Sequence, residues 1–163
     1  MGRKSEIWKM MQDPLPAVTE QRRLSYRPTK AEAVRVYKLI NESIFNNQLA
    51  MPDIELMSNC RKYWGMCYGE YKPIKYRKTR CRIRLMNKFY CRQWFIVTLA
   101  HELIHQFQWD IIGPEREDIG KERMLSHGPS FFQFRSKFAE HGMPLKVTLR
   151  TKKWFAHQDL FKC

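Results

Sequence analysis

A stretch of 22 residues near the middle of the chain, 91–112, constrains the fold more than any other feature. It is apolar nearly all round and too long for a β-strand, so it predicts a helix buried in the core. Gly113 and Pro114 follow it and predict where the helix ends. The longest nearly unbroken apolar run in it, Trp94 to Ala100, is far shorter than the roughly 18 residues that span a bilayer. The sequence therefore predicts no transmembrane helix.

Three polar residues interrupt this apolar helix in the pattern H-E-x-x-H. His101 and His105 are four residues apart and project from one helical face, so both imidazoles can reach one tetrahedral zinc ion. Glu102 is adjacent to His101 and can reach a water on that ion without ligating it. Burying these groups without a partner would be costly. A zinc site is therefore favoured over the alternative, in which the histidines are ordinary core residues.

A hydrolytic zinc usually has three protein ligands and keeps its fourth position for water. The third histidine of a metzincin would fall at position 111, which is Ile111, so that class is excluded. His127 is the favoured third ligand because it directly precedes Gly128-Pro129, a turn that would fix its ring. The alternative third ligand is an acidic residue of the charged segment 115–123, which is expected to be an exposed loop or lid. The candidates there are Glu115, Glu117, Asp118 and Glu122. The remaining histidines, His141 and His157, are expected on the surface.

The first part of the chain divides into an arm and a helix. Residues 1–28 contain three prolines and no steady period, which predicts a loosely packed arm with at most a short helix around Ser5 to Met11. Thr29 and Glu32 form a Thr-x-x-Glu capping box. Apolar residues at helical spacing follow, so we expect a helix that lasts to about Asn46.

Short apolar or alternating runs predict strands at 54–56, 64–68, 80–85 and 145–149. In the third of these, Cys81, Ile83 and Leu85 should face the core while the arginines between them point outward. A short helix is predicted between Gly128-Pro129 and Gly142, with phenylalanines at 131, 134 and 138 on its buried face. The fold class is therefore α+β, with a small mixed or antiparallel sheet packed on the buried helix. We expect an arm (1–28), one domain (29–151) and a basic-aromatic tail (152–163).

Basic residues are concentrated in one part of the chain. The sequence has 30 Lys plus Arg against 16 Asp plus Glu, a net charge of +14. Between Arg61 and Arg92 eleven residues are basic, only Glu70 is acidic, and aromatic residues are interleaved. Cations can neutralise phosphates while aromatic faces stack on bases, so nucleic-acid contact is favoured over a merely solvated surface. The predicted nucleic-acid-binding residues are Lys72, Lys75, Arg77, Lys78, Arg80, Arg82, Arg84, Lys88 and Arg92.

Three segments together resemble a known enzyme family. They are residues 101–105 (HELIH), 126–131 (SHGPSF) and 41–49 (NESIFNNQL) followed by Pro52. In this combination the chain resembles the SprT-like zinc metalloproteases over roughly residues 30–150. The resemblance implies a zincin-like fold, zinc held by His101, His105 and His127, and Glu102 as catalytic acid and base. Members characterised as proteases cleave proteins attached to DNA and need DNA for activity.

The chain departs from many members of that family after His127. Those members carry a C-terminal zinc ribbon with four cysteines, whereas only Cys163 follows His127 here. DNA binding would then depend on the basic stretch from Lys72 to Arg92 or on the tail from Lys152 to Phe155.

These observations lead to an expected function. We expect an endopeptidase with one zinc ion that acts on DNA-bound or DNA-crosslinked proteins and binds DNA, single-stranded or without sequence specificity. One alternative is a nucleic-acid-binding protein with a structural zinc, and another is a protease for a single free protein partner. A cytoplasmic location, nucleoid-associated or, in a eukaryote, nuclear, is expected because the first fifteen residues contain no apolar block and the five cysteines contain no C-x-x-C pair.

Overall fold

The computed structural model describes residues 4–15, 24–58, 63–114 and 126–148. The segments 115–125 and 149–163 lie outside them, and with them the predicted acidic loop, His157 and the basic-aromatic tail. In chain order the elements are α1 (Glu6–Met11), α3 (Lys30–Phe45), β1 (Asp53–Met57), β2 (Gly65–Gly69), β3 (Cys81–Met86), α4 (Arg92–Phe107), the π-helix η1 (Gln108–Ile112), α5 (Pro129–Phe132) and α6 (Arg135–Glu140).

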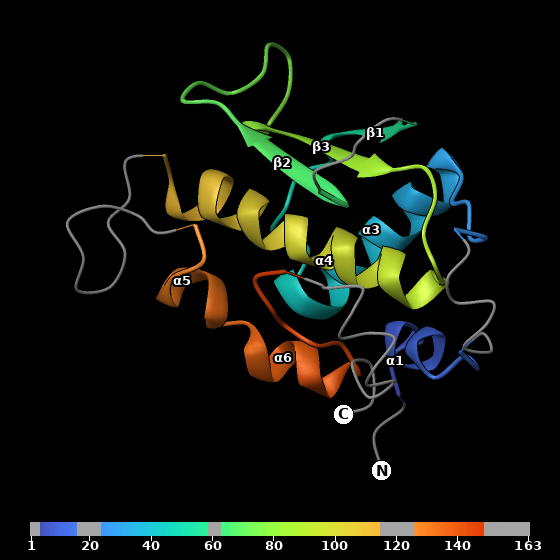
Figure 1. Ribbon diagram of the computed structural model, residues 1–163. Coiled ribbons are helices and arrows are strands. Elements are labelled where there is room, and N and C mark those ends of the chain that lie inside the picture. The colour runs from blue at the N-terminus through green and yellow to red at the C-terminus, as the bar shows by residue number, and fades with distance from the viewer. Residues whose placement is uncertain (1–3, 16–23, 59–62, 115–125, 149–163) are drawn as a thin grey trace.

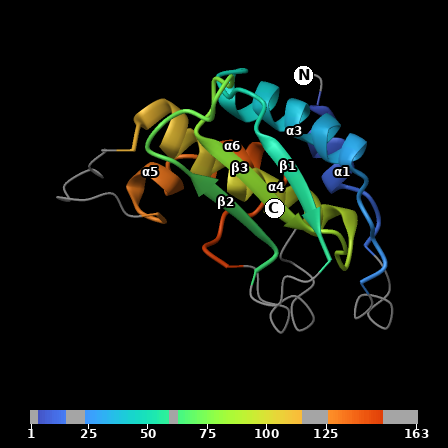
Figure 2. The same ribbon diagram turned by 90° about the horizontal axis from the view of Figure 1, so that it is seen from above.

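The three strands form one small mixed sheet in the order β1-β3-β2, as Figure 2 shows from above. β1 runs parallel to β3, and β2 runs antiparallel to it. The alternation predicted for β3 is confirmed, because Cys81, Ile83 and Leu85 are buried while Arg82 is exposed on the opposite face. The structure thus has the predicted α+β class with a small mixed sheet, and β2 is an edge strand.

The helices α3 and α4 pack against the inner face of this sheet (Figure 1). α4 and η1 together occupy the apolar stretch, and most of the α4 side chains, including Trp94 and Phe95, are buried. The α5 and α6 helices lie below α4 in Figure 1, on the side away from the sheet. Among the described residues, no helix combines the length and the apolar character that a membrane crossing requires.

The ends of α3 follow the local sequence. The Thr29 hydroxyl accepts a hydrogen bond from the Glu32 N–H at 3.1 Å, so the predicted cap is confirmed. Asn46 ends the helix in the left-handed conformation, with φ of 53°. The buried Asn41 amide then holds the returning chain, because it donates to the Leu49 carbonyl and accepts from the Leu49 N–H. This places β1 beside β3.

The N-terminal arm is packed more tightly than the sequence predicts. α1 is capped by the Ser5 hydroxyl, and its side chains Ile7, Met10 and Met11 are almost fully buried in the core. The expectation of loose packing is therefore wrong for this helix. Its apolar residues occur every third or fourth position, but six residues are too few for that period to stand out from the surrounding charges.

Two predictions for the C-terminal part are corrected. The single helix expected after Pro129 is two short helices, α5 and α6, although Phe131, Phe134 and Phe138 are all buried as expected. Residues 143–148 form no strand, and Leu145 is buried whereas Val147 is 48% exposed. The alternation there reflects a segment that buries Met143 and Leu145 but, among the described residues, pairs with no strand.

Candidate metal centre

Three imidazole rings converge on one point beside α4. The Nε2 atom of His101 lies 3.2 Å from Nε2 of His105 and 3.2 Å from Nε2 of His127. Nitrogen ligands of a tetrahedral zinc at 2.0–2.1 Å are about 3.3–3.4 Å apart, so this spacing fits a single ion. The structure therefore brings together all three histidines that the sequence singled out, and they lie close enough to bind one metal ion.

The three ligands come from two elements. His101 and His105 project from one face of α4, one turn apart, and His127 lies just before the N-terminus of α5. Phe131 of α5 is fully buried and contacts all three imidazoles, with ring centroids 4.7–5.2 Å apart. Phe131 thus forms an apolar floor that limits the movement of the histidine rings.

Gln108 fixes the orientation of His105, and sequence reasoning missed this residue. The Oε1 atom of Gln108 lies 2.8 Å from Nδ1 of His105, which places the proton on Nδ1 and leaves the Nε2 lone pair for a metal. The Gln108 amide nitrogen donates to the Ser126 carbonyl at 3.1 Å and to the Ser130 hydroxyl at 2.9 Å. Gln108 is 1% exposed and therefore links His105 to the turn that carries His127.

Burial favours the neutral form of His101 and His127, which is the form that binds a metal. Burial and the neighbouring His105 and His127 lower the pKa of His101 from 6.5 to about 3. Burial also lowers the pKa of His127. Three imidazole nitrogens close to one another are compatible with the ligand set of a zinc site that keeps a position for water.

Glu102 lies beside this cluster and between α4 and the sheet. It is 5% exposed, and its carboxylate accepts a hydrogen bond from the backbone N–H of Cys67 in β2. Burial raises its pKa from 4.5 to about 8, against the smaller opposing effect of that hydrogen bond. A β-carbon on Gly65 would lie 3.1 Å from Cγ of Glu102, so the absence of a side chain there makes room for the carboxylate.

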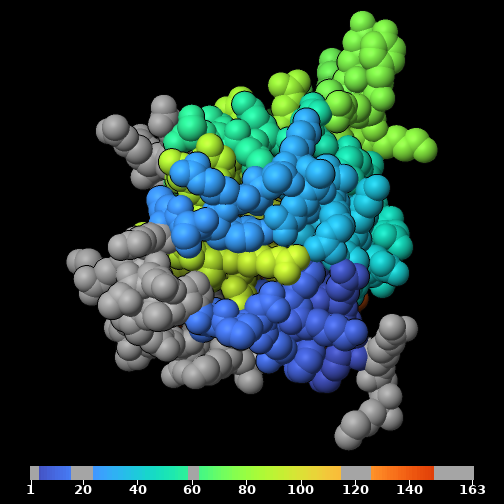
Figure 3. All heavy atoms as spheres, turned by 90° about the vertical axis from the view of Figure 1, so that its right-hand side faces the viewer, coloured from blue at the N-terminus to red at the C-terminus, as the bar shows by residue number. Residues whose placement is uncertain are grey.

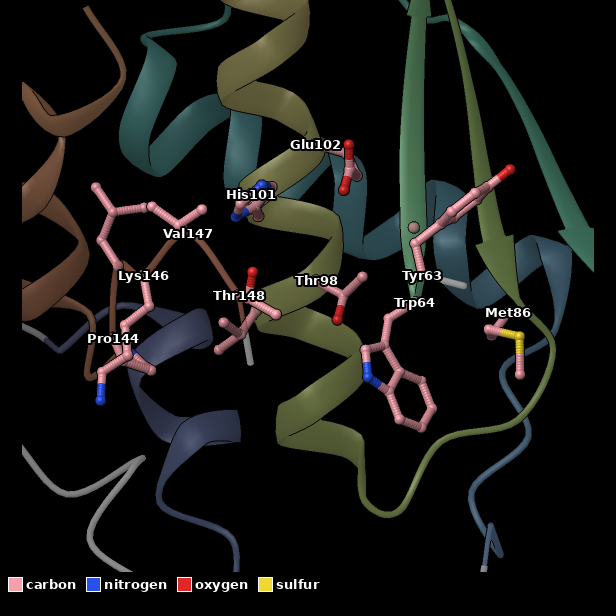
Figure 4. A pocket seen from close by; sticks show the side chains of 13 residues that line it. Tyr63, Trp64, Met86, Thr98, His101, Glu102, Pro144, Lys146, Val147 and Thr148 are labelled. Atoms are coloured by element: carbon pink, nitrogen blue, oxygen red, sulfur yellow. The ribbon is translucent and has the colours of Figure 1, made fainter. Parts of the chain in front are cut away.

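A cavity of about 460 Å³ opens beside His101 and Glu102. Figure 4 shows α4 along the cavity, Trp64 and Met86 on one side, and the segment 144–148 on the other. Its remaining lining residues are Tyr63, Gly65, Val97 and Thr98. The cavity thus has a mixed polar and apolar lining and lies next to a candidate metal site and a buried carboxyl group.

The residues predicted to bind nucleic acid do not form one stripe. Lys72, Lys75, Arg77 and Lys78 lie exposed in the loop between β2 and β3, Arg82 and Arg84 lie on the outer face of the sheet, and Lys88 and Arg92 lie near the start of α4. Arg80, which ends the loop, donates to the Tyr71 carbonyl. The nine residues therefore fall into three separate groups.

Carboxylates neutralise several of these cations. Arg77 pairs with Asp53 at 2.8 Å and Arg84 with Glu55 at 3.0 Å. Arg92 lies between two carboxylates, Asp13 at 3.4 Å and Glu32 at 3.3 Å. The sequence could not show this, because every acidic partner lies outside the basic stretch.

His141 takes no part in the metal centre. It is half-buried rather than on the surface as expected, and its Nδ1 lies 2.6 Å from the hydroxyl of Ser5 at the start of α1. Burial lowers its pKa. It joins the N-terminal helix to the end of α6.

None of the protein-family models, curated proteins or solved structures compared with the chain matches it. The function is therefore inferred from the arrangement of the site.

Proposed function

We propose that this protein is a zinc-dependent endopeptidase of the SprT-like type, with a zincin-like fold. The observation that carries the proposal is the convergence of three histidines beside a buried carboxyl group and an open cavity, with Nε2 of His101 3.2 Å from Nε2 of each of the other two. A purely structural zinc would usually have four protein ligands. Here the three histidines are the only such cluster among the described residues, and no fourth ligand accompanies them.

In this proposal His101, His105 and His127 would hold the ion, which would supply a water of lowered pKa and a polarised peptide carbonyl. Glu102 accepts the proton of the attacking water and passes it to the nitrogen of the leaving amine. Its environment suits this role, because burial raises the pKa of the carboxyl group to about 8. Such a group can both take and return a proton near neutral pH.

The free edge of β2 offers a place for an extended substrate. Met86 donates to the Trp64 carbonyl and Glu70 to the Arg80 carbonyl, so the ladder to β3 uses the even-numbered residues of β2. The backbone groups of Gly65, Cys67 and Gly69 therefore face away from β3, and the Cys67 N–H among them already donates to Glu102. A polypeptide that pairs with the remaining groups of this edge would pass Glu102 and place a side chain in the adjacent cavity.

We assign the substrates to proteins bound or crosslinked to DNA, which the enzyme would hold without sequence specificity. The support is the net charge of +14 and its concentration in residues 61–92. Phosphates held by these cations would raise the local concentration of attached protein at the cleft. This part of the proposal predicts activation by DNA that weakens as the salt concentration rises.

The test compares wild type with Glu102→Gln, both loaded with zinc, on a DNA-binding protein with and without single-stranded DNA. The variant should keep its zinc and lose at least about a hundredfold in cleavage rate, since proton transfer is removed. Glu55→Gln, an exposed carboxylate on the sheet, is the matched control and should cleave as wild type does. Equal cleavage by Glu102→Gln would refute the mechanism.

His127→Ala tests the ligand set. It should lose both metal and activity, because only two histidine ligands remain. Full zinc occupancy in this variant would indicate that the third ligand is an acidic residue of the segment 115–123 instead.

Two outcomes would favour the alternatives. Zinc-loaded protein that binds oligonucleotides but cleaves nothing would be a nucleic-acid-binding protein with a structural zinc. Cleavage of a free partner that DNA inhibits would indicate a protease for that partner.

A further inference from the structure

The loop between β2 and β3, residues 70–80, stands away from the body of the molecule (Figures 1 and 3). It presents two large aromatic side chains to solvent. Tyr76 is 92% exposed and Tyr71 is 69% exposed. Aromatic side chains this exposed contribute little to a core, and rings of this kind are enriched where proteins contact partners.

Three lysines surround these rings without acidic partners. Lys72, Lys75 and Lys78 are exposed, and among the described residues none of them forms an ion pair. The ammonium of Lys75 lies 5.0 Å from the centre of the Tyr76 ring. These three lysines therefore combine free positive charge with exposed aromatic faces, whereas Arg77 and Arg84 are paired with carboxylates.

The backbone at Tyr76 is unfavourable for a tyrosine. Its φ is 64°, a left-handed conformation that favours glycine or asparagine. Two hydrogen bonds hold the turn, from the Arg77 N–H to the Ile74 carbonyl at 2.8 Å and from the Ile74 N–H to the Thr79 carbonyl at 2.9 Å. A tyrosine at this position does not help the turn to form, so its exposed ring calls for another explanation.

The base of the loop is anchored on η1. Asp110 accepts a hydrogen bond from the Thr79 hydroxyl at 2.6 Å and from the Arg80 N–H at 2.7 Å. On the other side of the loop, the Tyr71 ring meets Trp109 edge-on, with centroids 5.8 Å apart. The tyrosines and lysines therefore project from a fixed base, which lowers the entropy lost when a ligand binds.

We propose that this loop is a docking site for single-stranded nucleic acid. The rings of Tyr76 and Tyr71 stack on bases, and Lys72, Lys75 and Lys78 contact the phosphates on either side. A duplex hides its base faces, and an acidic peptide has no flat faces to stack, so only a single strand uses both features of the loop. The inference rests on the proposed function only in that the bound strand brings attached protein to the cleft.

The first experiment measures binding of a labelled oligodeoxythymidine, roughly 15 nucleotides long, to the full chain by fluorescence anisotropy. Tyr76→Gly should weaken binding about tenfold, because one stacking face is lost. It should leave the melting temperature unchanged or raise it, because glycine suits the left-handed backbone. Tyr76→Phe keeps the ring and should bind as wild type does. Unchanged affinity in Tyr76→Gly would overturn the proposal.

The second experiment tests the phosphate contacts. Replacing Lys72, Lys75 and Lys78 by glutamine should lower the slope of log affinity against log salt by about two. The matched control replaces Lys4, Lys9 and Lys38, on or next to α1 and α3, and changes the net charge equally. Equal slopes in the two triple variants would refute a local contact.

Competition identifies the class of ligand. A duplex of the same sequence and poly-glutamate should each displace the oligonucleotide less well than unlabelled single strand does. Tighter binding of the duplex than of the single strand would overturn the assignment to a single strand. So would displacement by poly-glutamate that is equally effective in wild type and in Tyr76→Gly. None of these measurements requires proteolysis, so a failure of the proposed protease activity would remain distinguishable from a failure of the docking site.

Discussion

Gln108 is a buried amide that connects the two sides of the candidate metal centre. It accepts from His105 and donates to Ser126 and Ser130, so both sides of the site depend on it. Outer partners of this kind orient the ligands, and their loss typically lowers metal affinity by 10–100-fold.

Gln108→Met keeps the volume of the side chain and removes these hydrogen bonds. We expect zinc affinity, measured by competition with a chelator, to fall about 10–100-fold. Gln93→Met is the matched control, because Gln93 is equally buried but bonds to the Asp13 carbonyl. It should lower the free energy of unfolding and leave the zinc affinity unchanged. Unchanged zinc affinity in Gln108→Met would show that Gln108 only supports packing.

The Glu102 carboxyl group makes the stability of the metal-free protein depend on pH. Its pKa in the folded chain is raised to about 8 from 4.5, so folding favours the protonated form. This stabilising contribution is complete below about pH 4.5 and is lost as the pH rises through 8. Above that pH the folded state has to bury a charge.

Glu102→Gln removes this titration while leaving the histidines in place. In urea denaturation without metal, the variant should gain free energy of unfolding relative to wild type between pH 5 and 8. The expected gain is on the order of 4 kcal/mol. A difference that stays constant over this range would contradict a buried, protonated Glu102.

The local pattern of residues predicted much of this site. Two histidines on successive turns share a face in any helix, so His101, Glu102 and His105 could be placed from their spacing. His127 could be inferred because Gly128-Pro129 fixes a turn beside it. The role of Gln108 could not be predicted, because it depends on a contact with Ser126 that only the folded chain creates.

The π-helical segment η1 joins the metal site to the β2–β3 loop. Its first three residues point to different partners: Gln108 to the histidines, Trp109 to Gly69 and Tyr71, and Asp110 to the end of the loop. A π-helix has wider turns than an α-helix and is frequent at functional sites. No sequence period predicts it, whereas the caps of α3 are local and were predicted correctly.

Gly69 gives this element a sharp test. A β-carbon there would lie 2.0 Å from the Trp109 ring, so Gly69→Ala forces the indole or the strand to move. We expect a loss of about 1–3 kcal/mol in the free energy of unfolding, measured by urea denaturation. In a Trp109→Val background the same change should cost much less, since the ring is gone. An equal loss of free energy of unfolding in both backgrounds would show that the contact between residue 69 and the Trp109 ring does not cause the destabilisation.

The predicted final strand shows that alternation of apolar and polar residues is not sufficient to predict a strand. Alternation of Leu145, Lys146 and Val147 is compatible with a strand, but a strand also needs a free neighbour at the right distance. The structure instead uses these residues as one wall of the cavity beside His101.

Across the whole molecule, the candidate metal centre connects parts that are far apart in sequence. His101 and His105 belong to the central helix, and His127 begins the helical layer below it. A ligand that binds only the folded state stabilises it by mass action, so metal binding should hold these layers together.

Removing the metal should therefore lower the melting temperature of the full chain. With zinc at about a hundred times its dissociation constant, chelation should lower the transition by about 5–10 °C. His127→Ala should melt at the same temperature with and without chelator. If the melting temperature of wild type is the same with and without chelator, the three histidines do not hold a metal that stabilises the fold.

The buried N-terminal helix has a practical consequence for any shortened version of the chain. Ile7, Met10 and Met11 together contribute roughly 5–8 kcal/mol of burial, which is comparable to the whole stability of many domains. A fragment starting at Pro28 would keep every candidate zinc ligand and still expose an apolar groove along α3. Such a fragment should aggregate, and its inactivity would reflect the missing helix rather than the chemistry of the site.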